Sequence, residues 1–252
     1  SPKDLFPQRI VCLTEEPTET LYLLGEQDRI VGISGFTMRP AIARKEKPKV
    51  SAFSSANIEE IIALQPDLVI GFSDVQAEIA CALIARGSTV WSNNHRSGRG
   101  FHQMMVQLGA VVGKQAQAVA LAEEIAQNLQ RICAPNQQQP DKPKVYFEEW
   151  NDPLITGIQW VGELIELAGG IDIFPEFQKE SLAKDRIVAD PQEIVHRNPD
   201  IILASWCGKK FKKEELVGRP HWTKIAAVQL DCIFEIKSGL ILQPGPAALT
   251  VG

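Results

Sequence analysis

One sequence pattern occurs twice in this chain, once in each half. Residues 58–74 read IEEIIALQPDLVIGFSD, and residues 191–208 read PQEIVHRNPDIILASWCG. Each copy predicts a short amphipathic helix, a Pro-Asp pair that ends it, and four apolar residues of a buried strand. The Pro-Asp pairs begin at Pro66 and Pro199, about half a chain apart, which is too long for a solenoid repeat. The pattern therefore predicts two similar lobes.

Predicted strands and helices alternate through both halves. The segments that favour buried strands are 9–13, 30–33, 49–53, 68–71, 89–91, 144–147, 201–204 and 232–236. The segments that favour helices are 18–24, 77–86, 101–112, 160–168 and 222–228. Such alternation is typical of parallel sheets built from crossover units. We predict an α/β fold of two similar Rossmann-like lobes with central parallel sheets.

A single long helix is expected to join the lobes. Apolar residues recur at helical spacing from Lys114 to Cys133. The passage that follows, 135–143, is the most polar and proline-rich part of the chain. The predicted division is an N-terminal lobe over 1–112, a connecting helix over 113–134, a linker over 135–143 and a C-terminal lobe over 144–252.

Composition narrows the classes of partner. The net charge of −5 and the isoelectric point near 5.5 give no basic surface for nucleic acid, so we expect no nucleic-acid partner. The five cysteines are scattered without a C-x-x-C pair, which favours a reducing compartment and hence the cytoplasm. Neither a signal peptide nor an apolar run of membrane-spanning length is visible.

Candidate ligand residues follow from the predicted sheets, because ligands of open parallel sheets bind beyond the carboxyl ends of the strands. The loops there are rich in aromatic residues, which suits a large, flat or apolar ligand in a cleft between the lobes. Phe72 and Trp206 end the two copies of the repeat and are predicted to be facing walls. The full candidate set is Glu15, Phe36, Met38, Phe53, Phe72, His95, Glu148, Glu149, Trp150, Trp160, Trp206, Cys207, Lys209 and Gln243.

Motifs for catalysis and metal binding are missing from the sequence. No G-x-S-x-G, G-x-G-x-x-G, P-loop or H-E-x-x-H pattern is present, so no catalytic residue is predicted. His95 and Cys207 lie on predicted loops, where each is either merely exposed or an axial ligand to the metal of a bound macrocycle. Glu148 and Glu149 could do acid–base work, but without a nucleophile beside them hydrogen bonding to a ligand is the better interpretation.

Several phrases of the sequence resemble one family throughout nearly the whole chain. They are RIVCLTEEPTETLYLLGEQDRIVGISGF, SSANIEEIIALQPDLVIGF, VYFEEWNDPLITG with ELIELAGGIDIF, NPDIILAS, and HWTKIAAVQLDCIFEI. They are similar to the helical-backbone (class III) substrate-binding proteins of ABC importers for iron-siderophore, haem and vitamin B12, and most similar to the cobalamin-binding members. The resemblance implies two α/β lobes joined by a rigid helix, with a ligand cleft between them.

The resemblance also implies partners. The ligand would be a metal chelate such as cobalamin, cobinamide, haem or a ferric siderophore, with no intrinsic cofactor, and the protein would be a monomer that docks on a permease. In the family an exposed Glu of each lobe makes that docking contact; Glu59 matches the first, whereas Gln192 stands at the second, beside Glu193. The family implies the periplasm or cell envelope, in contrast to the compartment that the cysteines favour.

Three functions follow from this sequence. The first is a non-enzymatic substrate-binding protein of an ABC importer for a corrinoid or another metal chelate. The second is a cytoplasmic corrinoid-binding or sensing protein without a transporter. The third and weakest is an enzyme that acts on such a ligand through Cys207 or the Glu148–Glu149 pair.

Overall fold

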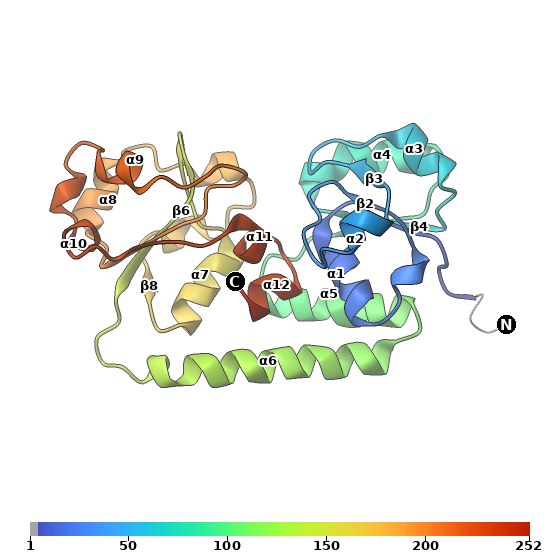
Figure 1. The fold of residues 1–252 in the computed structure, drawn as a ribbon, viewed down its shortest axis with the longest axis horizontal. Coiled ribbons are helices and arrows are strands. Elements are labelled where there is room, and N and C mark those ends of the chain that lie inside the picture. The colour runs from blue at the N-terminus through green and yellow to red at the C-terminus, as the bar shows by residue number, and fades with distance from the viewer. Residues whose placement is uncertain (1–4) are drawn as a thin grey trace. The chain divides into compact units, whose positions relative to one another are not determined.

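The computed structural model describes residues 5–252, which divide into two compact units (Figure 1). Unit 1 contains the chain up to His95, Arg99–Ala126 and Gln243–Leu249. Unit 2 contains Arg96–Gly98, Gln127–Leu242 and Thr250–Gly252. The connecting helix α6 (Gln115–Gln137) begins in unit 1 and ends in unit 2, as the long helix predicted from the sequence should. It continues through Pro135, which the sequence analysis placed in a linker.

Unit 1 is built on a five-stranded parallel sheet. Its strand order is β3-β2-β1-β4-β5, with β1 (Ile10–Cys12) in the centre and every neighbouring pair parallel. The other strands are β2 (Ile30–Ser34), β3 (Lys49–Ser51), β4 (Leu68–Phe72) and β5 (Val90–Asn93). All five lie where the sequence predicted strands, because each is a short apolar run bounded by turn residues.

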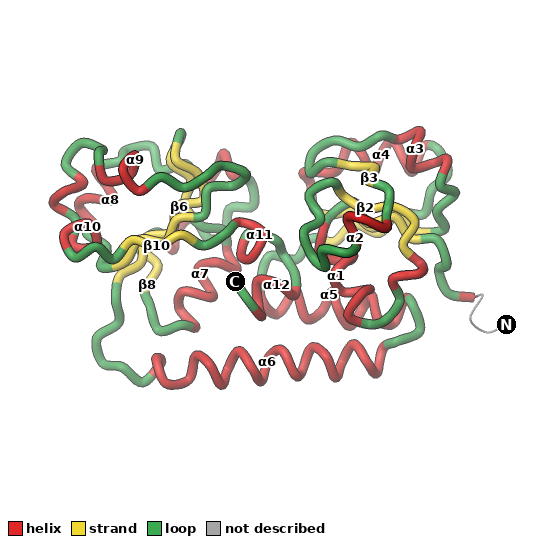
Figure 2. Tube along the Cα trace, in the orientation of Figure 1, coloured by secondary structure: helices red, strands yellow, loops and turns green. Residues whose placement is uncertain are grey.

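The helices of unit 1 connect these strands (Figure 2). They are α1 (Glu15–Leu23), α2 (Ala43–Glu46), α3 (Ile58–Ala63), α4 (Ala77–Ala85) and α5 (Gly98–Val111). Ile61 of α3 and Leu83 of α4 are fully buried and belong to one apolar cluster with Val11 and Val69 of the sheet. Burial of such side chains stabilises by about 1.5–3 kcal/mol each, so this cluster holds α3 and α4 to the sheet.

Unit 2 repeats the plan of unit 1 with one insertion. Its sheet has the order β10-β9-β6-β7, and β8 pairs in parallel with the first residues of β6. The strands are β6 (Lys144–Asn151), β7 (Leu154–Thr156), β8 (Ile171–Asp172), β9 (Ile201–Ala204) and β10 (Ile233–Glu235). The sequence β8-β6-β9-β10 therefore corresponds to β2-β1-β4-β5 of unit 1, and β7 is the addition.

The β6–β7 hairpin corrects the sequence analysis, which ended the strand at Phe147 and treated residues 148–153 as a loop. Glu148 pairs with Thr156 and Asn151 with Leu154 in an antiparallel ladder. The polar residues of this stretch concealed the strand, because one of their side chains is buried against charged partners rather than exposed to water. The sheets are otherwise parallel, as predicted.

The helices of unit 2 are short apart from α7. They are α7 (Gln159–Leu167), α8 (Gln192–Arg197), α9 (Lys213–Val217), α10 (Ala226–Gln229) and α11 (Ser238–Ile241). The last helix, α12 (Pro246–Thr250), lies almost wholly in the segment that belongs to unit 1. The core of unit 2 gathers Tyr146, Phe174, Ile194, Ile202 and Trp222 from five different parts of the chain.

The two copies of the repeat have the same local structure. Gln65 and Asn198, the residues before the two prolines, both have a left-handed backbone with φ of 48° and 47°. The Asp67 carboxylate accepts hydrogen bonds from the backbone N–H groups of Gln8 and Arg9, just before β1. Asp200 accepts one at 2.8 Å from the backbone N–H of Lys144, at the start of β6. Each Pro-Asp pair thus ends a helix and ties the next strand to the central strand of its sheet.

Candidate ligand-binding site

Three buried carboxyl groups lie at the carboxyl end of β1. Glu15, Glu16 and Glu19, in the first turns of α1, are 1%, 1% and 6% exposed. The Thr14 hydroxyl donates to Glu16 Oε1 at 2.8 Å, and the backbone N–H of Arg39 donates to Glu15 Oε1 at 3.0 Å. The Arg39 guanidinium donates to Glu19 Oε1 at 3.1 Å and is the one cation among residues 5–252 that contacts these carboxyl groups. We call Glu15, Glu16 and Glu19 the acid cluster.

Burial raises the pKa of every carboxyl group in the acid cluster. Burial raises the pKa of Glu15 to about 8 and that of Glu16 to about 7, because a charged carboxylate loses its hydration inside the protein. Burial also raises the pKa of Glu19, and Arg39 opposes that shift. Among the residues that the structure describes, Glu15 Oε2 and Glu16 Oε2 are buried and have no hydrogen-bond partner. Such oxygens are costly when ionised, which agrees with the raised pKa values.

The segment Gln243–Leu249 packs on the acid cluster. The backbone N–H of Ala247 donates to Glu19 Oε2 at 3.2 Å. A Cβ atom added at Gly245 would lie 2.4 Å from Glu16 Cβ, so only glycine fits there. His95 Nε2 lies 2.8 Å from the carbonyl oxygen of Pro244. These contacts place Gln243, a predicted ligand residue that is half-buried, at the start of the covering segment.

Three predicted ligand residues of unit 1 have exposed apolar side chains. Phe36 is 58% exposed, Met38 54% and Phe53 42%. The loop of Phe53 is braced from within by Gln76, whose side-chain amide donates to the carbonyl oxygens of Leu13 and Phe53. The loop of Phe36 and Met38 is held by Arg44, whose Nη1 donates to the carbonyl oxygens of Gly35 and Thr37. Gln76 is buried and also accepts from the backbone N–H of Phe72 at 2.9 Å. The strand-end loops of unit 1 therefore present an apolar surface on a fixed backbone.

The structure corrects the predictions for Phe72 and His95. Phe72 is 5% exposed and is a core residue rather than an exposed wall. The His95 ring packs edge-on against Phe72 and Phe101, with centroid distances of 5.2 and 5.4 Å, and its Nε2 is engaged by Pro244. His95 is thus a packing residue beneath the strand-end loops, and an axial metal ligand would have to give up these contacts.

Glu148, in β6, is the centre of a buried network in unit 2. Arg219 Nη1 and Nη2 donate to its two oxygens at 2.6 and 2.8 Å, which makes a bidentate ion pair. Trp206 Nε1 donates to Glu148 Oε1 at 2.9 Å, and the Tyr146 hydroxyl donates to Oε2 at 3.1 Å. Glu148 is fully buried, so the prediction that it contacts ligand is wrong for the protein in this state; it orients Trp206 instead.

Glu149, the neighbour of Glu148, is paired separately. Arg186 Nη2 donates to Glu149 Oε2 at 2.7 Å, and the rest of this buried guanidinium donates to backbone carbonyl oxygens, among them that of Thr156. Burial raises the pKa of Glu149, and Arg186 opposes the shift. Trp150 is half-buried, and its Nε1 donates to the carbonyl oxygen of Asp152. Acid–base work by the glutamate pair would require breaking these ion pairs.

Lys209 lies among aromatic rings at the end of β9. Its Nζ is 5.0 Å from the ring centroid of Trp206 and 6.0 Å from that of Trp150, and it donates to Asn151 Oδ1 at 3.3 Å. Trp206 itself is only 3% exposed, with Phe211 against its edge, so it is not the exposed wall that the sequence suggested. The ammonium group, rather than the indole face beneath it, lies at the surface.

Cys207 and Trp160 complete the predicted set. Cys207 is an exposed free cysteine whose thiol pKa is raised by burial of the sulfur and by Glu149, which disfavours the thiolate that a metal would need. Trp160 is 4% exposed and donates to the carbonyl oxygen of Ile241 at 2.7 Å, so it is a core residue. Within residues 5–252, no three His, Cys, Asp or Glu side chains are grouped to hold a metal ion.

The two predicted docking residues lie in the first turns of α3 and α8, with Glu193 one position after the residue that matches Glu59, which is Gln192. Glu59 is exposed and makes a bidentate ion pair with Arg86, at 2.5 and 2.9 Å. Glu193 lies 3.5 Å from Arg197 and is about half exposed. No helix in the described part of the chain is both long and apolar enough to cross a membrane.

Sequence analysis missed Arg186, Arg219 and Gln76. Each is buried or nearly so and fixes residues of the strand-end loops from inside. Arg219 meets Glu148 across 71 positions of sequence, so no local motif could reveal the pair. The available signal was indirect, because two adjacent glutamates at the end of an apolar strand require cations from elsewhere if they are buried.

The fold and these strand-end loops define a binding protein of the periplasmic type. Residues 10–240 match the model of the periplasmic binding protein family, and the chain belongs to that family. The family consists of binding proteins rather than enzymes, and it favours importer substrate binding over the cytoplasmic alternative. The cytoplasmic location that the five cysteines favoured is therefore not supported.

Two relatives in sequence and one solved structure are similar to this chain over most of its length. A cobalamin-binding protein of Halobacterium salinarum is 26% identical over 79% of this chain, and the match spans 54% of that relative's own length. A vitamin B12-binding protein of Vibrio cholerae is 26% identical over 97% of this chain and 86% of its own. The periplasmic haem-binding protein RhuT of Roseiflexus sp. RS-1 is similar in fold, with a TM-score of 0.81 at 21% identity, covering 96% of this chain and 95% of its own.

Proposed function

We propose that this chain is the substrate-binding component of an ABC importer and that its ligand is a corrinoid. The observation that carries the choice of ligand is the charge state of the strand-end loops. Arg39, Arg186, Arg219 and Lys209 are each engaged by carboxylates of their own unit. Haem and catecholate siderophores carry anionic groups, which need unpaired cations. A corrinoid presents neutral carboxamides instead.

The exposed side chains support the same choice. Phe36, Met38 and Phe53 offer apolar surface to one face of a large ring system. Their backbone is held by hydrogen bonds from Gln76 and Arg44, so ordering these loops on binding should cost little free energy. Two relatives named for cobalamin or vitamin B12 match most of this chain. Lys210 is exposed and forms no ion pair within the described residues, so a single anionic substituent could still be accommodated.

A titration tests the ligand class. We expect cyanocobalamin and cobinamide to quench tryptophan fluorescence saturably at micromolar or lower concentration. Haemin and ferric enterobactin should bind at least tenfold more weakly, because Arg39, Arg186, Arg219 and Lys209 are already engaged by carboxylates. Saturable binding of haemin with none of either corrinoid would overturn the proposal for the ligand and leave the family assignment unchanged.

Matched variants test the apolar surface. The double substitution Phe36→Ser and Phe53→Ser should weaken corrinoid binding at least tenfold while leaving the thermal midpoint almost unchanged, because both side chains are exposed. Leu230→Ser is the control, since Leu230 is 73% exposed and lies outside the strand-end loops. Equal binding by the double variant and the control would contradict the assignment of this surface.

The importer partner is proposed through Glu59 and Glu193. Both are exposed carboxylates on the first turn of equivalent short helices, one in each unit. Replacing both by Gln should abolish corrinoid-stimulated ATP hydrolysis by the reconstituted importer and leave corrinoid binding unchanged. The protein is proposed to act without catalysis, and a corrinoid-converting activity that Cys207→Ala removes would refute that part.

A further inference from the structure

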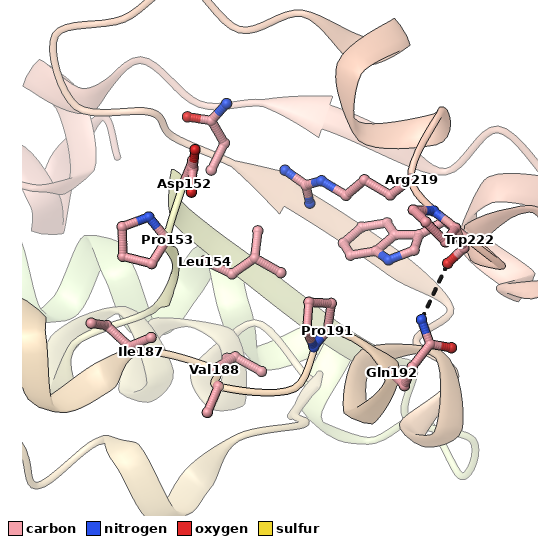
Figure 3. A pocket seen from close by; sticks show the side chains of 12 residues that line it. Asp152, Pro153, Leu154, Ile187, Val188, Pro191, Gln192, Arg219 and Trp222 are labelled. Carbon is pink, nitrogen blue, oxygen red and sulfur yellow. Dashed lines mark hydrogen bonds between the residues drawn. The ribbon is translucent and has the colours of Figure 1, made fainter.

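Unit 2 has a hollow whose lining includes none of the predicted ligand residues (Figure 3). It encloses about 360 Å³ between the turn of the β6–β7 hairpin, the chain before α8, and the loop that carries Arg219 and Trp222. Its walls are mostly apolar and include Pro153, Pro191 and Pro220. Because proline has a fixed backbone angle, these walls are largely pre-formed.

The lining contains a buried hydrogen-bond donor that the protein does not use. Trp222 is fully buried, and among residues 5–252 its indole Nε1–H has no acceptor. A buried indole N–H ordinarily finds a partner, because a buried donor without an acceptor is destabilising. Its ring is stacked under the Arg219 guanidinium and beside Tyr146, so the indole cannot turn to seek an acceptor elsewhere without disturbing the core.

The charges around the hollow exclude ionic ligands. The Arg219 guanidinium lines it but is neutralised by its bidentate bond to Glu148. Asp152, at the hairpin turn, adds a negative charge at the rim, which repels an anion. A cation would gain from Asp152 but would bring no acceptor to Trp222. The group that satisfies the lining is therefore uncharged and carries an acceptor.

We propose that this hollow is a second binding site, for a small uncharged molecule with an apolar body and one carbonyl oxygen, such as a lactam or tertiary amide. The apolar body contacts the proline rings and Leu154, and the carbonyl oxygen accepts from Trp222 Nε1–H. The site is independent of the corrinoid surface and of the importer function proposed above.

Gln192 controls access to the indole. Its side-chain amide donates to the carbonyl oxygen of Pro220 at 3.3 Å, a long bond at an exposed position, and the two residues meet at one end of the hollow (Figure 3). Because Trp222 has no exposed surface, a ligand reaches its N–H only when a neighbouring side chain moves. Movement of Gln192 breaks one long hydrogen bond, to Pro220, at an exposed position.

Indole ¹⁵N–¹H spectroscopy of the intact protein tests the site, with N-methyl-2-pyrrolidone as the probe. The lactam should shift the Trp222 indole resonance saturably, at millimolar concentration, more than those of the other four tryptophans. Pivalate and tetramethylammonium, of similar size but charged, should leave it unmoved. No saturable shift with the lactam, or an equal shift with either ion, would overturn the proposal.

Two variants test separately whether the ligand occupies the hollow and whether it accepts a hydrogen bond from Trp222. Ala189→Phe fills the hollow from an exposed position and should abolish binding; its matched control is Ala85→Phe, an equally exposed position lining a hollow of unit 1. Trp222→Phe removes the donor and keeps the ring, so lactam affinity measured by saturation transfer should fall five- to tenfold. Binding that survives Ala189→Phe, or an affinity unchanged in a folded Trp222→Phe protein, would contradict the site.

Discussion

Each unit has the dipeptide Glu-Glu near the carboxyl end of its central strand, and the two units bury it in opposite ways. Glu15-Glu16 begins α1 just after β1, and Glu148-Glu149 lies within β6. In unit 2, Glu148 and Glu149 each meet an arginine from a distant part of the chain. In unit 1, Glu15 and Glu16 have no arginine side chain of their own within the described residues, and two of their oxygens have no partner. Unit 2 thus buries ion pairs, whereas unit 1 buries carboxyl groups that retain protons.

The difference shows that a buried glutamate can be stabilised either by an ion pair or by remaining protonated. An ion pair inside a protein is strongly held only while both partners are present, since either one alone is an uncompensated buried charge. A protonated carboxyl group needs no counter-ion, but its stability depends on pH. The carboxyl end of the unit 2 sheet is therefore stabilised by two ion pairs, whereas the stability of the unit 1 sheet end should change with pH as Glu15 and Glu16 ionise.

The largest effect is expected from breaking the ion pair of unit 2. Arg219→Met leaves the fully buried Glu148 without its cation and should lower the free energy of unfolding by about 3–5 kcal/mol. Urea denaturation at pH 7 measures the loss. Adding Glu148→Gln to this variant should restore most of it, because no buried charge then remains. A single variant as stable as the parent would show that the pair is dispensable.

A substitution in unit 1, at Glu16, is expected to raise the free energy of unfolding, by less than Arg219→Met lowers it. The folded protein holds the Glu16 proton to a pKa of about 7, whereas the unfolded chain releases it near 4.5. The folded state therefore binds more protons between these values, so stability is fully present below about pH 4.5 and is lost as the pH rises through 7. Glu16→Gln does not titrate and should be more stable than the parent at pH 8.5, by on the order of 2 kcal/mol.

Denaturation midpoints at pH 5 and pH 8.5 test this prediction. The gain from Glu16→Gln should be small at pH 5 and appear at pH 8.5. Glu149→Gln is the matched control from unit 2, because it leaves Arg186 unpaired and should destabilise at both values. If both variants behaved alike, the contrast between the units would disappear.

The smallest effect is expected from one hydrogen bond. Thr14→Val removes the hydroxyl that donates to Glu16 Oε1 and keeps the side-chain shape. While Glu16 is protonated the loss should be about 1 kcal/mol, the usual value for a neutral bond, and it should grow as Glu16 ionises above pH 7. A loss that is the same at pH 5.5 and pH 8.5 would mean that Glu16 does not change its charge in this interval.

Most of the fold could be predicted from the sequence, because its elements are locally encoded. Every predicted strand lies in the structure within a few residues, and the Pro-Asp repeat correctly indicated two similar units. The β6–β7 hairpin was missed because Glu148 and Asn151 are polar and look like loop residues. The helix α1 begins three residues earlier than predicted, since its first turn contains buried glutamates.

The sequence predicted which candidate residues lie at strand ends but not which of them have exposed side chains. Position along a strand predicted that Phe36, Met38 and Phe53 lie at strand ends, and their exposure agrees with a binding surface. Exposure itself was not predictable: Phe72 and Trp206 also lie at strand ends, of β4 and β9, yet they are buried and pack against His95 and Phe211. Contacts with residues outside the strand itself determine which of these aromatic side chains is exposed and which is buried.

The segment Gln243–Leu249 gives the chain an unusual order of assembly. It follows almost all of unit 2 in sequence but belongs to unit 1. There it packs on the acid cluster, and its Pro244 carbonyl oxygen contacts His95 Nε2. During synthesis unit 1 is therefore completed only after nearly all of unit 2 has been made, because Gly245 and Ala247 contact Glu16 and Glu19 from this late segment. Before the segment is made, the acid cluster lacks both of these contacts.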